Sequence, residues 1–417
     1  MKFSYLVIGG GMVGLATARY LLLADPGASV ALVEAKARTC SGNSARSAAL
    51  YRNLFSSPTS RLLAESSISY YLGFATELGL RPNGYLWCFS ASQWAGVAAA
   101  AAGLVGQTRA ASLLDAAAIG ASLRLSDGSG DQAVSQAIFG GRCGSLSAQA
   151  LGAHYERLFE AGGGIVQRGR SIARLELAPG SVQRFAAAVD TTGKRLEAER
   201  FVVATGCWLQ DLLGPAGIAS GVYPKKRQLF AFRLDDPGWL AAADPSGSER
   251  GRSGLPNIIL PGGVYLKPIP ERRLCVAGLA DDLGRPFELP YAPVERAAAE
   301  PDYFRAAIEP ELRRHFPGLA AQAEPLTIVT AWAGHYDYYW PDRNPVIERI
   351  SNLVWVGGCS GSGIMKADAI GRLAAAKAVG QAQVSLAQAG PAGEDVAFSV
   401  DDLSLRQRRV ERESLVI

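Results

Sequence analysis

The chain has 417 residues, of which 48% are hydrophobic and 19% are charged, and these globular proportions exclude a largely disordered protein. Its net charge of +4 comes from 42 basic and 38 acidic residues scattered along the sequence. No stripe of arginine and lysine is interleaved with aromatics, which argues against nucleic-acid binding. Because this length exceeds one ordinary hydrophobic core, we expect two domains or one domain with a large insertion.

The sequence also limits the cellular compartment that we expect. No apolar run approaches the roughly 20 residues that span a bilayer. The chain enters an apolar strand at Tyr5–Ile8, without a secretory signal. The six cysteines are widely spaced and form no CxxC pair, which argues against a zinc site and a disulfide scaffold. We therefore expect a cytoplasmic protein with reduced thiols, no metal and no transmembrane segment.

The first motif is a glycine turn between a strand and a helix. A buried strand leads into Gly9-Gly10-Gly11-Met12-Val13-Gly14, which fits G-x-G-x-x-G, and helical patterning follows over Leu15–Leu23. The glycines allow a tight turn, the approach of a pyrophosphate and close packing of the helix on the strand. A second strand, Val30–Val33, ends at Glu34, which can accept hydrogen bonds from ribose hydroxyls. The motif predicts dinucleotide binding without separating FAD from NAD, and its candidate residues are Gly9, Gly11, Met12, Val13, Gly14, Glu34 and Ala35.

Three later segments point to one of these cofactors. They are the small-residue loop Ser41–Arg52, the strand Arg200–Val203 with Ala204-Thr205-Gly206 after it, and the block Trp332–Leu373 with its glycine loop Gly358–Gly363 before a helix. In this order they resemble the D-amino-acid oxidase superfamily of FAD-dependent oxidoreductases, in its sarcosine oxidase, glycine oxidase and proline dehydrogenase-like branch. The resemblance implies FAD contacts at Ser44, Arg46, Ser47, Ala48, Ile172, Ala204, Thr205, Gly206, Trp208, Gly334, Gly361, Ser362, Gly363 and Ile364.

The resemblance also implies an α/β fold of two parts. A discontinuous FAD-binding domain, Rossmann-like and of the glutathione-reductase type, takes residues 1–78, 146–215 and 327–390. An α+β substrate domain with a mainly antiparallel sheet takes residues 79–145 and 216–326. Its second segment alternates over 222–233, 263–267 and 273–279, which predicts antiparallel strands, and the Pro- and Gly-rich loop 235–256 is expected to be mobile. Residues 391–417 would form a tail with a short helix, and the basic run 406–412 predicts a solvated helix.

Five side chains are candidates for the chemistry at the flavin. Arg52 matches an arginine that contacts the substrate carboxylate in the sarcosine oxidase branch, and a guanidinium suits that contact. Lys366 lies in the first turn of a predicted helix, where a cation is unfavourable unless an anion is near. Lys267 lies near the position of the oxygen-activating lysine of sarcosine oxidases, and Tyr265 shares its side of a strand. The alternative for each of these residues is that it has no role at the flavin and its side chain points into solvent or packs against other side chains.

His335 is the fifth candidate. It stands close to the position where some relatives tether the flavin through a cysteine, and no cysteine is present there. We therefore expect noncovalent FAD, although a histidine link is chemically feasible. His154 and His315 fall in helical segments and are expected to be structural. The aromatic neighbours of His335 either wall a substrate pocket or pack in the core: Tyr336, Tyr338 and Tyr339.

These candidates lead to a functional hypothesis with two alternatives. The leading hypothesis is an amino or imino acid dehydrogenase or oxidase. It transfers hydride from the α-carbon of a small substrate of the sarcosine, proline, glycine or D-amino-acid type to flavin N5. A 2-hydroxy acid dehydrogenase, with His335 as the base, is the first alternative. A flavoprotein subunit or assembly partner with little activity of its own is the second. The electron acceptor stays open among oxygen, a quinone and a carrier, and a homo-oligomer stays open as well.

Overall fold

The computed structural model of the protein describes residues 2–107, 111–123, 133–234, 256–280, 297–387 and 395–415. The loop that we expected to be mobile, 235–256, lies outside the described residues except for Pro256. Within these ranges no helix has the length and apolar character needed to cross a bilayer. The six cysteines are all buried and unbridged.

The first sheet contains eight strands in the described residues, with a parallel centre. Its central strand, β1 (Lys2–Ile8), pairs in parallel with β2 (Val30–Val33) on one side and β11 (Arg195–Val203) on the other. A short apolar run buried on both faces is typical of such a strand, and Tyr5–Ile8 is fully buried. Five further strands complete the sheet: β8 (Ile165–Gln167), β9 (Ile172–Leu177), β10 (Phe185–Asp190), β17 (Val346–Ile350) and β18 (Leu353–Gly357).

Helices cover one face of this sheet. Helix α1 (Met12–Ala24) packs between α5 (Ala148–Ala161) and α10 (Gly363–Val379), and α10 also packs on α2 (Pro58–Leu72). The contact of α1 with α10 is close because a Cβ on Gly371 would lie 2.6 Å from the Cβ of Ala16. On the opposite face, the short helix α6 (Leu209–Leu213) packs in a core with Phe201 and Trp355.

The second sheet is mainly antiparallel. Its eight described strands follow the order β16 (Ile328–Tyr339), β12 (Val222–Arg233), β15 (Leu274–Leu279), β14 (Val264–Ile269), β13 (Asn257–Ile259), β4 (Tyr85–Phe89), β6 (Gln136–Gly140) and β5 (Ala111–Asp115). Only the pairing of β13 with β4 is parallel. The sequence prediction of antiparallel strands is therefore confirmed for β12, β14 and β15.

The remaining elements border the two sheets. The second sheet is flanked by α3 (Ala91–Gln107), α4 (Ala116–Leu123), α7 (Pro301–Tyr303), the π-helical turn η7 (Phe304–Ile308), α8 (Glu309–His315) and α9 (Pro317–Ala320). Two small ribbons pair β3 (Leu50–Tyr51) with β7 (Gly144–Ser145) and β19 (Gln383–Ala387) with β20 (Asp395–Ser399). Short 3₁₀ turns are η2 (Gly206–Trp208), η3 (Gly214–Ala216), η5 (Pro270–Arg272) and η8 (Val400–Leu403). Histidines 154 and 315 lie in α5 and α8, as expected.

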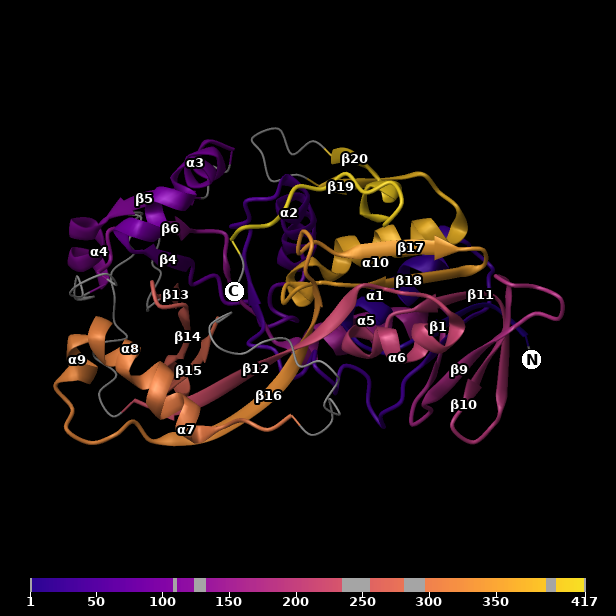
Figure 1. Cartoon of the computed structure of the whole chain (residues 1–417), viewed down its shortest axis with the longest axis horizontal. Helices are drawn as coiled ribbons and strands as arrows, with labels where there is room; N and C mark the ends of the chain where they lie inside the picture. The colour runs from indigo at the N-terminus through magenta and orange to yellow at the C-terminus, as the bar shows by residue number, and fades with distance from the viewer. Residues whose placement is uncertain are drawn as a thin grey trace.

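Figure 1 shows the two sheets at opposite ends of the long axis, with β12 and β16 running from the middle of the molecule into the second sheet. The strands of the first sheet come from residues 1–78, 146–215 and 327–390, and most strands of the second come from 79–145 and 216–326. The exception is β16, which belongs to the second sheet although it follows residue 327. The division of the chain into domains stays a prediction.

One prediction about the tail is wrong. Residues 406–412 form no helix and run as irregular backbone across the surface of the fold. Contacts to other segments replace the expected solvated helix, because the Arg408 guanidinium bonds to the Asp342 carboxylate and to the carbonyls of Asn344 and Pro345. Hydrogen bonds to other segments therefore hold this basic run in an irregular conformation in place of the predicted helix.

Candidate functional site

A cavity of about 460 Å³ lies at the carboxyl ends of the central parallel strands, and we name it the larger cavity. Gly9 after β1, Glu34 after β2 and Ala204 after β11 line one side of it. Residues of β12 and β16 line the other side, among them Arg227 and Tyr336. In open α/β sheets, ligands bind outside the carboxyl ends of the strands. The cavity therefore has the position and size of a cofactor site.

The glycine turn after β1 leaves no room for a side chain at Gly9 or Gly14. Gly9 has a φ of +107°, and a Cβ on it would lie 2.5 Å from the carbonyl oxygen of Ala204. A Cβ on Gly14 would lie 1.9 Å from the carbonyl oxygen of Gly9, so the first turn of α1 packs directly on the strand end. Helix α1 has no side-chain cap and no acid in its first turn. Its N-terminal N–H groups are thus placed for an anionic group in the cavity.

Glu34 is fixed against this turn by two backbone hydrogen bonds. Its Oε2 accepts from the N–H of Gly10 at 2.8 Å, and its Oε1 accepts from the N–H of Lys36 at 2.9 Å. The carboxylate lines the larger cavity. This is where an acid can accept hydrogen bonds from the hydroxyls of a ribose.

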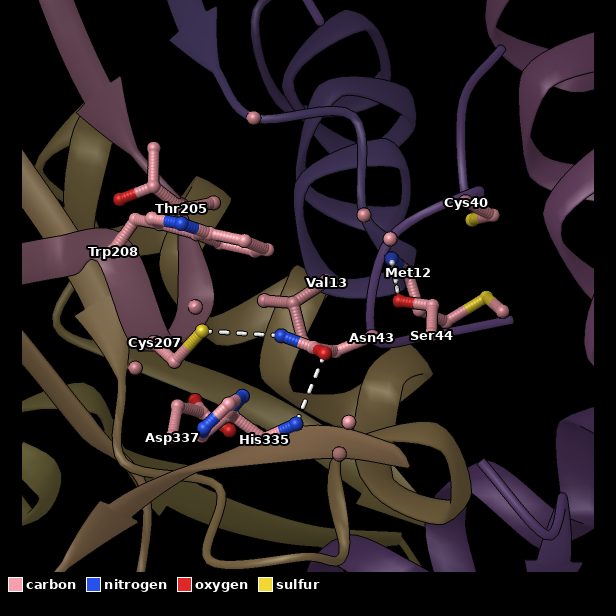
Figure 2. A pocket seen from close by; sticks show the side chains of 18 of the residues that line it. Met12, Val13, Cys40, Asn43, Ser44, Thr205, Cys207, Trp208, His335 and Asp337 are labelled. Carbon is pink, nitrogen blue, oxygen red and sulfur yellow. Dashed lines mark hydrogen bonds between the residues drawn. The ribbon is translucent and has the colours of Figure 1, made fainter. Parts of the chain in front are cut away.

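Asn43 connects the small-residue loop to two other segments of the cavity wall (Figure 2). Its Nδ2 donates to the Sγ of Cys207 at 3.0 Å, and its Oδ1 accepts from the backbone N–H of His335 at 3.0 Å. A third dashed line in Figure 2 joins the N–H of Met12 to the Oγ of Ser44 at 3.3 Å. The loop therefore closes the cavity between α1, η2 and β16.

A second helix also begins at this cavity. Helix α10 starts at Gly363, and its N-cap residue Ser362 makes no side-chain capping bond to the helix. Gly361 precedes it with a φ of +84°, and a Cβ there would lie 2.4 Å from the ring of Tyr336. Two helix N-termini thus meet the cavity, each able to stabilise negative charge through its dipole.

A smaller cavity of about 50 Å³ adjoins the larger one, and both are lined by Ser47, Ala48, Tyr265, Tyr336, Gly361 and Ile364. Two buried cations, Arg52 and Lys366, line only the smaller cavity. The Arg52 guanidinium lies 4.1 Å from the ring centroid of Phe55, and the Lys366 Nζ lies 4.0 Å from the same centroid. The interpretation of either residue as solvent-exposed is therefore wrong.

Each cation has few partners for its charge. Arg52 donates from Nη2 to the carbonyl of Leu415 at 2.8 Å and from Nη1 to the carbonyl of Leu54, while its Nε has no hydrogen-bond partner among the described residues. Lys366 donates to the Oγ of Ser60 at 2.8 Å.

Burial lowers the pKa of Arg52 and lowers the pKa of Lys366 to about 7. The buried carboxylate of Glu413 lines the same cavity and acts against the lowering of both pKa values. Two desolvated cations beside one carboxylate leave an excess of positive charge, which favours an anionic ligand.

The family of the chain follows from its sequence. The family model described as FAD dependent oxidoreductase, DAO, matches residues 4–377. The chain belongs to this family. FAD is the cofactor of the family, and the larger cavity fits it, since it offers an acid for a ribose and two helix N-termini for a pyrophosphate and a flavin.

Solved structures share the fold. L-proline dehydrogenase from P. horikoshii superposes with a TM-score of 0.74 at 19% identity, over 91% of this chain and 94% of that one. Glycine oxidase from Geobacillus kaustophilus superposes with a TM-score of 0.70 at 18% identity, over 97% and 98% of the two chains. At these identities the likeness establishes the fold, and the expected α/β fold with its FAD-binding part is confirmed.

A curated relative matches over a shorter region. The FAD-dependent oxidoreductase domain-containing protein 1 of Bos taurus is 28% identical over 197 residues, which are 43% of this chain and 35% of that protein. The match therefore spans about a third of the relative's length.

The larger cavity brings together most residues predicted to contact FAD. Gly14 and Ser362 do not line it: Gly14 packs against Gly9, and Ser362 lines the smaller cavity. The predicted residues that do line it are Gly9, Gly11, Met12, Val13, Glu34, Ala35, Ser44, Arg46, Ser47, Ala48, Ile172, Ala204, Thr205, Gly206, Trp208, Gly334, Gly361, Gly363 and Ile364. Their roles toward FAD stay predictions.

The other candidates for chemistry are distributed around the two cavities. Tyr265 lines both, and His335 is buried and lines the larger one. Lys267 lines neither, because its Nζ donates to the carbonyl of Ala48 at 2.7 Å. Burial lowers the pKa of Lys267 to about 8. Lys267 is therefore separated from the larger cavity by Ala48, and its predicted effect on the flavin would have to act through that residue.

Sequence reasoning missed several side chains of these cavities, among them Arg227, Tyr85 and Glu413. Arg227 and Leu229 are two residues apart on β12 and so lie on the same side of the strand, where both line the larger cavity. The period of the strand was therefore the available signal. Tyr85 and Glu413 line the smaller cavity. Neither belongs to a motif, and only the tertiary fold brings them to Arg52.

Proposed function

We propose that the protein oxidises the α-carbon C–N bond of a small amino or imino acid, of the sarcosine, proline, glycine or D-amino-acid type. One observation carries this proposal: the buried cations Arg52 and Lys366 line the smaller cavity, which shares lining residues with the larger cavity. Bound FAD would supply the acceptor for the hydride, which carries both electrons of the oxidation. The residues of the chain would bind, orient and desolvate the substrate.

Arg52 would bind the substrate carboxylate. A guanidinium forms charge-assisted hydrogen bonds with a carboxylate, and these are about twice as strong as neutral ones. The Nε of Arg52 and the hydroxyl of Tyr85 are buried without hydrogen-bond partners in the described part of the chain, and both residues line the smaller cavity. Buried polar atoms of this kind call for a partner, which a bound ligand would supply.

Lys366 would add a second charge to the carboxylate site. With a pKa lowered to about 7, its amine loses its proton easily in the absence of an anion. A bound carboxylate would favour the protonated form. Tyr265 and Tyr336 line both cavities and would exclude water from the region between carboxylate and cofactor.

The amine of the substrate would react in its neutral form, since a protonated nitrogen cannot donate electrons toward the breaking C–H bond. His335 lines the larger cavity, and this position also supports the alternative 2-hydroxy acid dehydrogenase, in which a base takes the hydroxyl proton. Lys267 would act on electron transfer to an acceptor through the loop at Ala48.

We further propose that FAD is held noncovalently. The thiols of Cys40, Cys207 and Cys359 line the larger cavity, and burial raises the pKa of each. The thiolate required for a covalent link is therefore disfavoured. Acid precipitation of the purified protein should release FAD into the supernatant, whereas FAD that remains with the pellet would contradict this proposal.

The proposed carboxylate site is tested by pairs of substrates that differ only in charge. The FAD-loaded protein is mixed without oxygen with glycine and glycinamide, and with proline and prolinamide, while flavin absorbance is followed. We expect bleaching by an acid and little by its amide. Arg52→Met should raise the half-saturating acid concentration by roughly 10- to 100-fold, because charged hydrogen bonds contribute about 1.5–3 kcal/mol. Arg81→Met, which alters an exposed ion pair with Glu271, is the control. Equal bleaching by acid and amide would refute the site.

A further inference from the structure

The C-terminal segment 404–415, which we name the strap, crosses from the first sheet to the smaller cavity. In Figure 1 it is the yellow trace that ends near the middle of the molecule, beside α2. Its first part is held firmly: Arg408 Nη2 donates to Asp342 Oδ1 at 2.6 Å, and the Asn344 side chain donates to the carbonyl of Glu411 at 2.9 Å. The N–H of Glu413 donates to the carbonyl of Asp342 at 2.9 Å.

Glu413 clamps the strap onto the start of α2. Its buried carboxylate accepts hydrogen bonds from the N–H and Oγ of Ser56, at 2.9 and 2.7 Å, and from the N–H of Ser57 at 2.9 Å. Ser57 is the N-cap of α2, so the helix dipole also favours this negative charge. These three hydrogen bonds, which we name the Glu413 clamp, fix the position at which the strap reaches the smaller cavity.

Beyond the clamp, Leu415 reaches Arg52. Its carbonyl oxygen accepts from Nη2 of Arg52 at 2.8 Å, and its side chain is buried in an apolar cluster with Leu54 and Trp87. Its N–H donates to Oε1 of Glu413 at 2.8 Å. Leu415 therefore accepts from Nη2, one of the guanidinium nitrogens from which a bidentate carboxylate would accept.

We propose that Leu415 is a built-in competitor of the substrate carboxylate for Arg52, and that substrate binding releases the end of the strap while the Glu413 clamp holds. This inference rests on the proposed function of Arg52 as the carboxylate anchor. A buried guanidinium without acceptors is unstable, and the carbonyls of Leu54 and Leu415 accept from its two Nη groups, while Nε has no partner among the described residues. A carboxylate replaces a neutral carbonyl because its hydrogen bonds to a cation are stronger.

The competition sets the affinity of the site. Only the fraction of molecules with Leu415 released can bind a carboxylate, so the apparent affinity falls by that fraction. Loss of the buried Leu415 side chain should increase the released fraction. The base of the strap should be unaffected, since Arg408 and Glu413 keep their own partners.

The test uses the full-length, FAD-loaded protein with propionate as the probe and propionamide as its neutral counterpart. Leu415→Ala removes the apolar anchor, and Leu415→Met keeps an apolar side chain of similar size as the matched control. Binding is followed by the difference absorbance of FAD. We expect Leu415→Ala to bind propionate about tenfold more tightly than the wild type, as an increased competent fraction requires. Leu415→Met should resemble the wild type.

Hydrogen exchange supplies a second readout that does not depend on a substitution. Saturating propionate should accelerate exchange of the Leu415 N–H and leave the Glu413 N–H protected, while propionamide should change neither. The proposal is overturned if Leu415→Ala binds propionate no better than the wild type, or if exchange at Leu415 does not respond. Propionate binding to neither form would overturn both this proposal and the carboxylate anchor. Tighter propionate binding by Leu415→Ala without oxidation of any amino acid would keep the strap proposal and reject the proposed function.

Discussion

The carboxylate of Glu34 accepts a 2.8 Å hydrogen bond from the backbone N–H of Gly10, which joins the end of β2 to the glycine turn after β1. The bond holds the acid at the wall of the larger cavity, next to the N-terminus of α1. The predicted ribose acceptor and the predicted phosphate site are thereby fixed relative to each other.

Glu34→Ala should therefore weaken FAD binding. Loss of hydrogen bonds to a charged acceptor costs about 1.5–3 kcal/mol, so we expect a dissociation constant roughly 10- to 100-fold higher. FAD fluorescence titration of the cofactor-free protein measures it. Glu197→Ala, which alters an exposed side chain on β11, is the control and should bind FAD as the wild type does. Unchanged affinity in Glu34→Ala would show that Glu34 does not contact the cofactor.

Gly14→Ala should impair folding and FAD retention together. The added Cβ would lie 1.9 Å from the carbonyl oxygen of Gly9, and backbone has to move to relieve that contact. Gly103→Ala offers a helical control on α3, where a Cβ meets nothing within 4 Å, and it should raise stability by about 0.5–1 kcal/mol. Thermal unfolding and bound-FAD content report both effects. A Gly14→Ala protein with normal stability and full FAD would contradict the packing described at this turn.

Carboxylate binding should depend on pH through Lys366. Burial lowers its pKa to about 7, and the protonated amine is the form that attracts a carboxylate. The dissociation constant of propionate should therefore rise as the pH increases above 7, with proton uptake on binding. Lys366→Met should bind more weakly and lose this pH dependence. Lys267→Met should keep it, because Lys267 lines neither cavity. Calorimetry in two buffers of different ionisation enthalpy measures the proton uptake, and its absence would exclude Lys366 from the site.

His335→Gln separates amine oxidation from alcohol oxidation. A general base contributes about 10²- to 10⁴-fold to a rate, and oxidation of a hydroxy acid needs a base for the hydroxyl proton. We expect a less than about tenfold loss of the rate of flavin reduction by an amino acid, since no base is required there. The backbone N–H of residue 335 keeps its bond to Asn43, so the loop stays in place. A loss of about 10²-fold or more in the rate of flavin reduction by a hydroxy acid would favour the hydroxy acid alternative, and the same loss with an amino acid would contradict base-free amine oxidation.

The sequence allowed prediction of those parts of the site that local chemistry determines. The turn Gly9–Gly14 and the acid Glu34 belong to a compact motif in which each residue has a physical role, and both line or shape the cavity. The strands β12, β14 and β15 followed from their alternation. Arg52 was found through a resemblance, because nothing in its neighbourhood predicts that it is buried.

The features that could not be predicted from the sequence depend on contacts between distant segments. Arg52 and Leu415 are 363 positions apart, and no periodicity in the sequence brings them together. The basic run 406–412 was interpreted as a helix because its partners, among them Asp342 on another segment, are not visible in the local pattern. Lys267 was placed beside the flavin by analogy, whereas its Nζ bonds to the Ala48 carbonyl.

Oxidation of an amino or imino acid is checked by mixing the FAD-loaded protein, without oxygen, with sarcosine, proline, glycine, D-alanine, lactate and 2-hydroxyglutarate in turn while the oxidised flavin band is followed. We expect loss of that band with at least one of the amino or imino acids and a slower loss, or none, with the hydroxy acids. Bleaching by the hydroxy acids alone, or by none of these compounds, would contradict the proposed function.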